Sequence, residues 1–198
     1  GVGYLRPDGR LEHLGCQCLL LACNGFGGNT QMVSELLPEM VRAVFAGHQG
    51  NDGTAIQWGR QLDLRLADLD AYQGHGSWAM PQNALVTWAF IMEGGVQVNA
   101  LGKRFNDETG GYSEAAVHVL AQPGAIAWNV FDDPLLELLR GFPDFRDAEA
   151  AGALRTAPDV AGLAALIGCD RSTLQATLDE IAPGRTDSLG RTFKRSLK

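Results

Sequence analysis

The chain has 198 residues, of which 45% are hydrophobic and 20% charged, and this composition excludes an intrinsically disordered protein. The formal net charge of −7 argues against a nucleic-acid partner, because phosphate binding needs a concentrated basic face and the sequence has only short basic pairs. No apolar run approaches the roughly 20 residues that span a bilayer, and no signal peptide opens the chain, so we expect a soluble, cytoplasmic protein without a membrane partner.

The first 62 residues predict a hairpin, a strand and two helices. Pro7-Asp8-Gly9 is a turn signal between two extended stretches, and the apolar run 18–22 suits a buried strand. Asn29 can cap a helix that reaches Leu37, just before a proline, and residues 54–62 have apolar side chains at helical spacing. We therefore expect the chain to begin as a mixed α and β structure.

The middle of the chain predicts a second hairpin, a helix and a further strand. Residues 96–99 and 103–105 flank a turn in which Gly102 can supply the unusual backbone angle. Ser113 can cap a helix that ends at Leu120, and residues 125–131 read as a strand.

The last third of the sequence predicts helices. Residues 135–139, 160–167 and 172–181 place apolar side chains three and four positions apart, and Gly168 is a typical helix stop. The basic residues near the C-terminus are expected to lie in a solvated helix or tail. These are Arg191, Lys194, Arg195 and Lys198.

The cysteine pattern argues against a metal site. The chain has four cysteines, of which three lie in or beside the apolar run 18–22 and the fourth stands apart. The sequence has no C-x-x-C pair of the kind that builds a zinc site. We therefore interpret Cys16, Cys18, Cys23 and Cys169 as core thiols.

Several short segments, taken in order, resemble one family. The glycine-rich segment 24–29 alone has two interpretations: a tight turn, or a backbone that a cofactor approaches closely. Together, however, the segments resemble FAD-dependent oxidoreductases of the fumarate reductase, succinate dehydrogenase and 3-ketosteroid dehydrogenase superfamily. These segments are ACNGFGGN at 22–29, GNDG at 50–53, QGH at 73–75, GGVQVN at 94–99, GKRF at 102–105, DE at 107–108 and DSLGR at 187–191.

This resemblance implies an α+β fold and a division into two parts. Residues 1–28 would be the tail of the FAD-binding domain, a short β hairpin and strand, and residues 29–198 would form the substrate-capping domain. The G-x-G-x-x-G fingerprint that binds the ADP half of FAD does not occur in the sequence. We therefore expect an interior piece of a longer enzyme, inactive by itself, whose partner is the FAD-binding domain of the same polypeptide.

The resemblance also implies which residues contact the cofactor, FAD. In the glycine-rich segment these are Ala22, Cys23, Asn24 and Gly25, and in the second turn the contact comes from Asp52. His75 matches a histidine that binds a substrate carboxylate in fumarate reductases, whereas a lone histidine in any other context is more often structural.

Two positions differ from fumarate reductases and imply another substrate. Thr87 and Trp88 stand where those enzymes have a Thr-Glu pair that clamps a dicarboxylate, so a charge is replaced by an aromatic wall. Tyr112 stands where they have a proton-delivering arginine, and a tyrosine resembles the base of 3-ketosteroid dehydrogenases. Its alternative role is packing at the start of a helix, with its hydroxyl tip in a hydrogen bond.

These features indicate an FAD-dependent oxidoreductase acting on CH–CH bonds. It would add or remove hydrogen across a carbon–carbon bond activated by a neighbouring carbonyl or carboxylate, with hydride transfer at flavin N5 and an unidentified electron acceptor. The alternative is a stand-alone, non-redox module, derived from the cap, that binds a small molecule or a protein.

Overall fold

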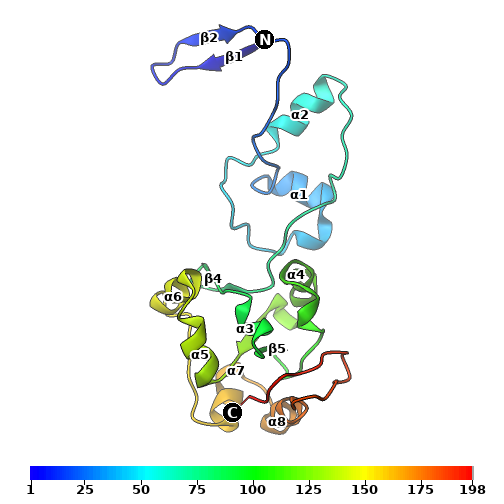
Figure 1. Ribbon diagram of the computed structural model, residues 1–198. Helices are drawn as coiled ribbons and strands as arrows, with labels where there is room; N and C mark the ends of the chain where they lie inside the picture. Colours follow the sequence, from blue (N-terminus) through cyan, green and yellow to red (C-terminus); the bar gives the residue numbers. More distant parts are fainter. Residues whose placement is uncertain (198) are drawn as a thin grey trace. The chain divides into compact units, whose positions relative to one another are not determined.

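The computed structural model describes residues 1–197 and divides the chain into two compact units, residues 1–71 and residues 72–198. Figure 1 shows the elements of each unit, which we describe separately. Within residues 1–197, three small two-stranded sheets and a larger number of helices make this a mixed α and β protein, as the sequence predicts. No helix among residues 1–197 is long and apolar enough to cross a membrane.

The N-terminal unit contains a hairpin and two short helices. The antiparallel strands β1 and β2 form the expected hairpin around Gly9, and Asn29 caps α1 by accepting a hydrogen bond from the Met32 amide at 3.0 Å. The elements are β1 (Val2–Leu5), β2 (Leu11–Leu14), α1 (Thr30–Leu36), η1 (Pro38–Met40) and α2 (Thr54–Gln61). Both helices agree with the prediction.

Two predictions for this unit are wrong. Residues 18–22 form no strand, and Leu20 is 88% exposed, because no neighbouring strand covers this run in the structure. Cys16, Cys18 and Cys23 are exposed and not core thiols, and Cys169 in the other unit is half-buried. Among residues 1–197, no cluster of three His, Cys, Asp or Glu side chains could hold a metal ion.

The C-terminal unit begins with small strands and short helices. Its first elements are β3 (Trp78–Ala79), β4 (Ala84–Leu85), α3 (Ala89–Met92), β5 (Val96–Asn99), η2 (Glu108–Gly110), α4 (Tyr112–Leu120), η3 (Pro123–Ala125) and β6 (Ala127–Val130). β5 pairs with β6, and not with residues 103–105 as predicted, so Gly102 with its positive φ closes a turn and not a hairpin.

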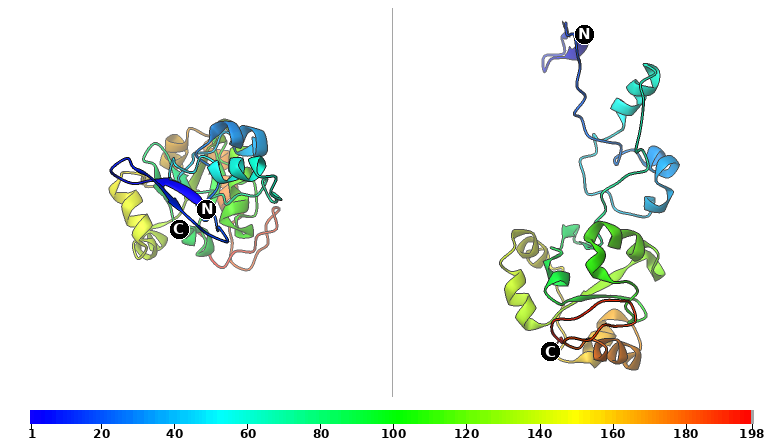
Figure 2. Two further views of the ribbon diagram at one scale, coloured as in Figure 1. Left: turned by 90° about the horizontal axis from the view of Figure 1, so that it is seen from above. Right: turned by 45° about the vertical axis from the view of Figure 1, so that its right-hand side comes forward.

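Helices complete this unit, as the apolar periodicity predicts. They are α5 (Asp133–Leu139), α6 (Pro143–Ala150), α7 (Val160–Ile167) and α8 (Arg171–Asp179). Gly168 ends α7 in a left-handed conformation, whereas α6 was not predicted. Figure 2 shows the final segment, drawn in red, folded back against the same unit.

Two apolar clusters form the core of the C-terminal unit. The first joins α3, α4, α5 and α6 through buried residues such as Phe90, Ile91 and Phe145. The second packs α7, α8 and Phe193 against the β5–β6 sheet. Helices α7 and α8 therefore hold the strands of this sheet in place. Polar side chains of the same strands bond to residues 76 and 77, which follow His75.

The C-terminal basic residues do not form the solvated tail predicted from the sequence. Arg191 is 3% exposed, and Arg195 forms an ion pair with Asp132. Each finds a carboxylate partner from a segment far away in the sequence, which local periodicity does not reveal. Lys194 is exposed, as predicted, and Lys198 lies outside the described residues.

Candidate functional site

His75 lies in a segment that packs directly against the start of α4. A Cβ atom added to Gly74 would lie 2.7 Å from the Ala116 Cβ, and one added to Gly76 would lie 2.7 Å from the Ala115 Cβ. Any larger residue at either position would push the segment away from the helix. The two glycines beside His75 therefore bring its ring to the N-terminus of α4.

Two hydrogen bonds hold this contact in place. The Gly74 amide donates to the Ser113 hydroxyl at 2.9 Å, and the Gly76 amide donates to the Tyr112 carbonyl at 2.8 Å. Ser113 is thus not the helix cap that the sequence predicts: Gly111 is the N-cap, and the helix begins at Tyr112. The serine hydroxyl is used instead to bind the histidine segment.

Three of the predicted substrate-site residues form one aromatic cluster. The ring of His75 stacks on that of Tyr112, with centroids 5.0 Å apart and planes 24° from parallel. The indole of Trp88 lies edge-on to the His75 ring, with centroids 5.9 Å apart. The Phe90 ring packs against Trp88 from the core, with centroids 5.7 Å apart. Residues 37 positions apart in sequence, His75 and Tyr112, are therefore in direct contact.

The protonation of His75 follows from its surroundings. Burial lowers the pKa of His75 below its ordinary value of 6.5, and the field of Asp144 opposes this only in part. The Nδ1 atom accepts a hydrogen bond from the Ser77 amide at 3.2 Å, so Nδ1 carries no proton. His75 is therefore neutral near pH 7, with its hydrogen on Nε2, where it can act as a donor.

Tyr112 is 40% exposed, and its hydroxyl oxygen accepts a hydrogen bond from the Gln73 side chain at 3.0 Å. Because Gln73 is the donor, the hydroxyl hydrogen of Tyr112 is not used in this bond. Sequence reasoning placed Gln73 in a motif but gave it no role. Its position two residues before His75, on the same extended segment, was the available signal.

Thr87 and Trp88 have different environments. The Thr87 hydroxyl accepts a long hydrogen bond of 3.4 Å from the Ala89 amide, at the start of α3. Trp88 is 8% exposed, and its indole nitrogen has no hydrogen-bond partner among the described residues. Trp88 thus forms a wall behind His75, whereas the Thr87 hydroxyl stabilises the local turn at the start of α3.

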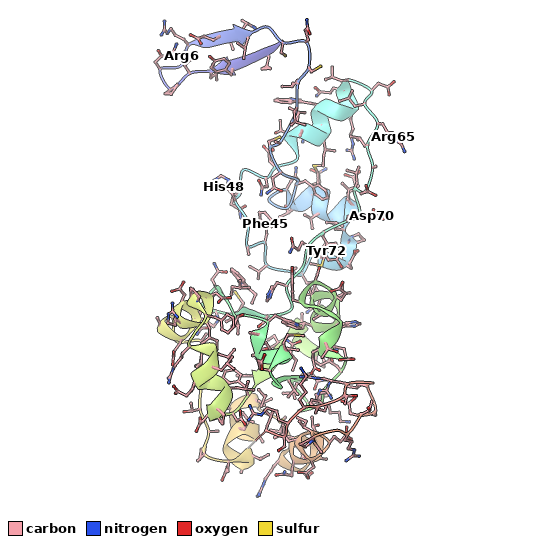
Figure 3. All side chains as sticks on the ribbon, viewed as in Figure 1. Arg6, Phe45, His48, Arg65, Asp70 and Tyr72 are labelled. Atoms are coloured by element: carbon pink, nitrogen blue, oxygen red, sulfur yellow. The ribbon has the colours of Figure 1, made fainter. Side chains whose placement is uncertain are left out.

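The predicted cofactor residues line one cavity within the N-terminal unit. Its volume is about 430 Å³, and Ala22, Cys23, Asn24, Gly25 and Asp52 all contribute to its lining. The two turns that carry them are joined, because Gly28 donates through its amide to the Asn51 carbonyl at 2.8 Å. Figure 3 labels Phe45 and His48 in the loop that leads into the second turn.

The glycines of these turns have different reasons to be glycine. A Cβ on Gly28 would lie 2.6 Å from the Gln49 carbonyl oxygen, so packing excludes any side chain there. A Cβ on Gly25 would meet no protein atom within 4 Å, and Gly25 does not have a positive φ. Neither packing nor backbone strain requires glycine at position 25, where the space opens on the cavity, and a cofactor that approaches the backbone fits this observation.

Asp52 holds the start of α2. Its carboxylate accepts hydrogen bonds from the Thr54 hydroxyl at 2.6 Å and from the Thr54 amide at 2.9 Å. These bonds, the first above all, lower the pKa of Asp52. The exposed carboxylate is therefore a fixed negative acceptor at the edge of the cavity, suited to a ligand hydroxyl.

Trp58 also lines this cavity, and sequence reasoning assigned it only to the apolar face of a helix. It lies one turn after Thr54 on α2 and is 47% exposed. A large aromatic side chain that a helix leaves uncovered beside glycines is the signal that could have identified it.

The remaining family-like motifs build a buried ion network in the C-terminal unit. The Glu108 carboxylate, 0% exposed, binds the guanidinium groups of Arg104 at 2.5 Å and Arg191 at 2.9 Å. Arg104 also pairs with Asp187, and the Phe193 ring lies 4.9 Å from the Arg104 guanidinium and 4.6 Å from that of Arg191. The segments that carry these motifs are therefore fastened to one another by charge.

Arg191, a member of the buried ion network, is bound by several protein groups. It donates to the carbonyl oxygens of Gly95 at 2.9 Å and Ile91 at 2.7 Å. Burial lowers the pKa of Arg191, while the Glu108 carboxylate opposes this. Its donors are directed at protein groups, so we interpret this arginine as structural and not as a substrate ligand.

Comparison with known proteins agrees with the resemblance. Residues 6–190 match the sequence model of a family described as FAD binding domain. The probable fumarate reductase Ifc3 of Shewanella frigidimarina (strain NCIMB 400) is 26% identical over 182 residues, which cover 88% of this chain and 31% of that protein.

Two solved structures share the fold. The open conformation of a flavocytochrome c3 fumarate reductase has a TM-score of 0.74 at 23% identity, covering 89% of this chain and 32% of that one. A 3-ketosteroid-Δ4-(5α)-dehydrogenase from Rhodococcus jostii RHA1, in complex with 4-androstene-3,17-dione, has a TM-score of 0.56 at 20% identity, covering 88% of this chain and 36% of that one. The chain spans about a third of the length of these relatives.

Proposed function

This chain belongs to the family described as FAD binding domain, and on that premise we propose that it is part of an FAD-dependent oxidoreductase acting on CH–CH bonds. The reaction adds or removes hydrogen across a carbon–carbon bond next to a carbonyl or carboxylate. The observation that carries the proposal is the aromatic cluster, in which His75 stacks on Tyr112 at 5.0 Å in front of Trp88. A neutral donor and a hydroxyl are thus adjacent, as proton chemistry at such a bond requires.

The division of labour follows the two parts named from the sequence. Residues 1–28 belong to the FAD-binding domain, and residues 29–198 form the α+β substrate-capping domain, with the rest of the FAD-binding domain as partner. The residues that hold FAD are Ala22, Cys23, Asn24, Gly25 and Asp52, which line one cavity. When bound, FAD supplies the hydride acceptor or donor at N5.

His75 binds and orients the substrate. Its Nε2 hydrogen donates to the carbonyl or carboxylate oxygen, since Nδ1 is engaged by the Ser77 amide. Because burial keeps His75 neutral near pH 7, it contributes a hydrogen bond and not a positive charge. Positions 87 and 88, Thr87 and Trp88, carry no carboxylate that could clamp a dicarboxylate, and the Trp88 ring lies against His75 as an apolar wall. The substrate is therefore larger and less charged than a dicarboxylate, in the class of enones or ketosteroids.

Tyr112 transfers the proton. Its hydroxyl oxygen is held by Gln73 at 3.0 Å, and its 40% exposure leaves the hydroxyl accessible to a substrate. The alternative role, helix packing with a hydrogen-bonded tip, predicts that the hydroxyl contributes only the roughly 1 kcal/mol of one hydrogen bond. The two roles therefore differ in the size of the effect expected when the hydroxyl is removed.

Tyr112→Phe in the complete flavoprotein tests this role. Phenylalanine keeps the ring that stacks on His75 and deletes only the hydroxyl. We expect turnover to fall by about 10²–10⁴, the usual worth of general acid–base catalysis, while flavin content and melting temperature are unchanged. Retention of more than about a tenth of the wild-type rate would assign Tyr112 to packing.

His75→Ala is the companion variant, with an expected loss of substrate binding and turnover at normal flavin content. The substrate class is tested by anaerobic bleaching of the flavin absorbance with ketosteroids and saturated ketones, or by reoxidation of the reduced flavin with enones and unsaturated dicarboxylates. A protein that holds FAD but responds to none of these compounds would contradict the proposal. A protein that holds no FAD would favour the alternative, a non-redox module derived from the cap.

A further inference from the structure

A set of polar side chains lies behind His75, on the sheet formed by β5 and β6. Gln97 of β5 and Asn129 of β6 are partners in the antiparallel register, and Gln97 is 1% exposed. The side-chain nitrogen of Gln97, Nε2, donates to Asn129 Oδ1 at 2.9 Å and to the Gly76 carbonyl at 2.8 Å. Asn129 Nδ2 in turn donates to the Ser77 hydroxyl at 2.6 Å. The sheet therefore holds both residues that follow His75.

The orientation of each amide in this set is fixed by its neighbour. The carbonyl of Gly76 can only accept, so Gln97 must turn its nitrogen toward it. The same nitrogen requires an acceptor from Asn129, which leaves the Asn129 nitrogen facing Ser77. The three groups thus have one arrangement, and hydrogen bonds in a chain of this kind strengthen one another in a buried environment.

The other end of the set is anchored on the buried ion network. The backbone amide of Gln97 donates to Glu108 Oε1 at 3.0 Å. Glu108 is held by Arg104 and Arg191, which belong to segments on either side in sequence. The polar set is therefore tied to a rigid part of the unit, and it can transmit that rigidity to residues 76 and 77.

At its front end the set reaches the histidine. The Ser77 amide donates to His75 Nδ1 at 3.2 Å, which selects the tautomer with its hydrogen on Nε2. We infer that Gln97, Asn129 and Ser77 are positioning residues, which hold the His75 ring against Tyr112 and keep Nε2–H as its donor. This inference rests on the proposed function, in which that hydrogen binds the substrate.

Removing the set has a predictable consequence for His75. A leucine at position 97 leaves the Gly76 carbonyl and Asn129 Oδ1 without their donor, and buried acceptors move toward water when they lose a partner. The segment then loosens, and His75 becomes more hydrated. The other groups that act on the ring are Tyr112 from α4, stacked on it, Trp88 before α3, edge-on to it, and the charged Asp144 from α6.

The experiment compares Gln97→Leu and Ser77→Ala with Asn99→Leu in the complete protein. Asn99 is a matched control, because it is a buried amide on the same strand whose bonds go to Gln122 at 3.0 Å and to the Leu101 amide at 2.9 Å, away from His75. The readout is hydrogen–deuterium exchange at the C2 position of His75, followed by mass spectrometry over a range of pH. This exchange reports the pKa of the ring without any need for substrate.

We expect Gln97→Leu and Ser77→Ala to raise the pKa of His75 toward its ordinary value, and Asn99→Leu to leave it unchanged. The peptide that contains the exposed His118 serves as an internal reference. Turnover should fall by about 10- to 100-fold in the first two variants, the scale of a misplaced reacting group. Ser77→Ala removes a single hydroxyl, so it still tests the inference if Gln97→Leu does not fold.

The two proposals fail in different ways. A His75 exchange profile that is identical in wild type and in both variants would overturn the positioning role, whatever the activity. The exchange profile of His75 could shift in the two variants while the wild-type protein turns over no carbonyl compound. That result would uphold the positioning of the ring and contradict the proposed function. A loss of activity in Asn99→Leu equal to that in Gln97→Leu, at equal stability, would show a general defect of the sheet and overturn the inference.

Discussion

The two units of this chain carry family-like motifs in opposite environments. In residues 1–71, the buried apolar side chains are Phe26, Met32 and Leu37, and the motif residue Asp52 is exposed. In the C-terminal unit, two apolar clusters are present, and the motif residues Glu108 and Arg191 are almost fully buried. Motifs of one family thus have two roles: exposed motif residues are free to contact a ligand, and buried motif residues stabilise the fold.

Glu108→Ala tests the fastening role and should have the largest effect on stability. It leaves Arg104 and Arg191 with buried guanidinium groups and without their shared carboxylate. Breaking a buried pair by removing one partner typically costs about 3–5 kcal/mol. Thermal and denaturant unfolding of the complete protein should show this loss.

The matched control is Glu149→Ala, which removes a carboxylate from an exposed pair with Arg140. Surface pairs contribute little, so the melting temperature should be almost unchanged. Equal losses in the two variants would mean that burial of the ion network has no special weight in this protein, and the contrast between the units would lose its basis.

Gly28→Ala and Gly25→Ala sharpen the comparison within the N-terminal unit. The new Cβ at position 28 would lie 2.6 Å from the Gln49 carbonyl, a backbone atom that no side-chain rotation can move, so we expect a loss of about 1–3 kcal/mol. The new Cβ at position 25 meets no protein atom, so stability should be unchanged.

For FAD the expected effect of Gly25→Ala is a weakening of about tenfold, equivalent to about 1.4 kcal/mol, because the methyl group occupies space that opens on the cavity. Titration of the apoprotein with FAD, followed by flavin fluorescence, measures it. Normal FAD affinity together with normal stability would leave no role for glycine at this position and would remove Gly25 from the cofactor site.

The pH dependence of stability should show the smallest effect. Burial places the pKa of His75 below 6.5, so the unfolded chain binds more protons than the folded one just below that pH. Stability is therefore lost as the pH falls from about 6.5 through the lowered pKa. The loss should be modest, since the ring is only half-buried.

His75→Gln should flatten this part of the profile, because it removes the group whose pKa burial lowers. Melting temperatures measured between pH 5 and pH 8 would provide the comparison. A profile that His75→Gln leaves unchanged would show that the neutral ring contributes nothing to folding.

Local signals in the sequence were sufficient for most helices. The Asn29 cap, the Gly168 stop and the apolar spacing of residues 160–167 each depend on neighbours within one or two turns, and the structure confirms them. The strands were less predictable. Residues 96–99 do form a strand, but its partner is Ala127–Val130 and not the adjacent segment, because pairing is decided by packing across the unit.

The candidate site divides in the same way. The order of the motifs indicated His75, Trp88 and Tyr112 as candidate site residues. Only the tertiary structure brings the three rings together and makes His75 a neutral donor. The sequence held no sign that Gln97 and Asn129 lie behind them.

By itself, the sequence determined most of the helices, the order of the motifs and through them the family, since each of these is encoded in short stretches of chain. The tertiary structure alone decided that Glu108 gathers Arg104 and Arg191, that residues 18–22 are not a buried strand, and that Gly25 faces open space. The physical reason is that burial, ion pairing and free volume depend on atoms brought together from distant parts of the chain, which no local pattern records.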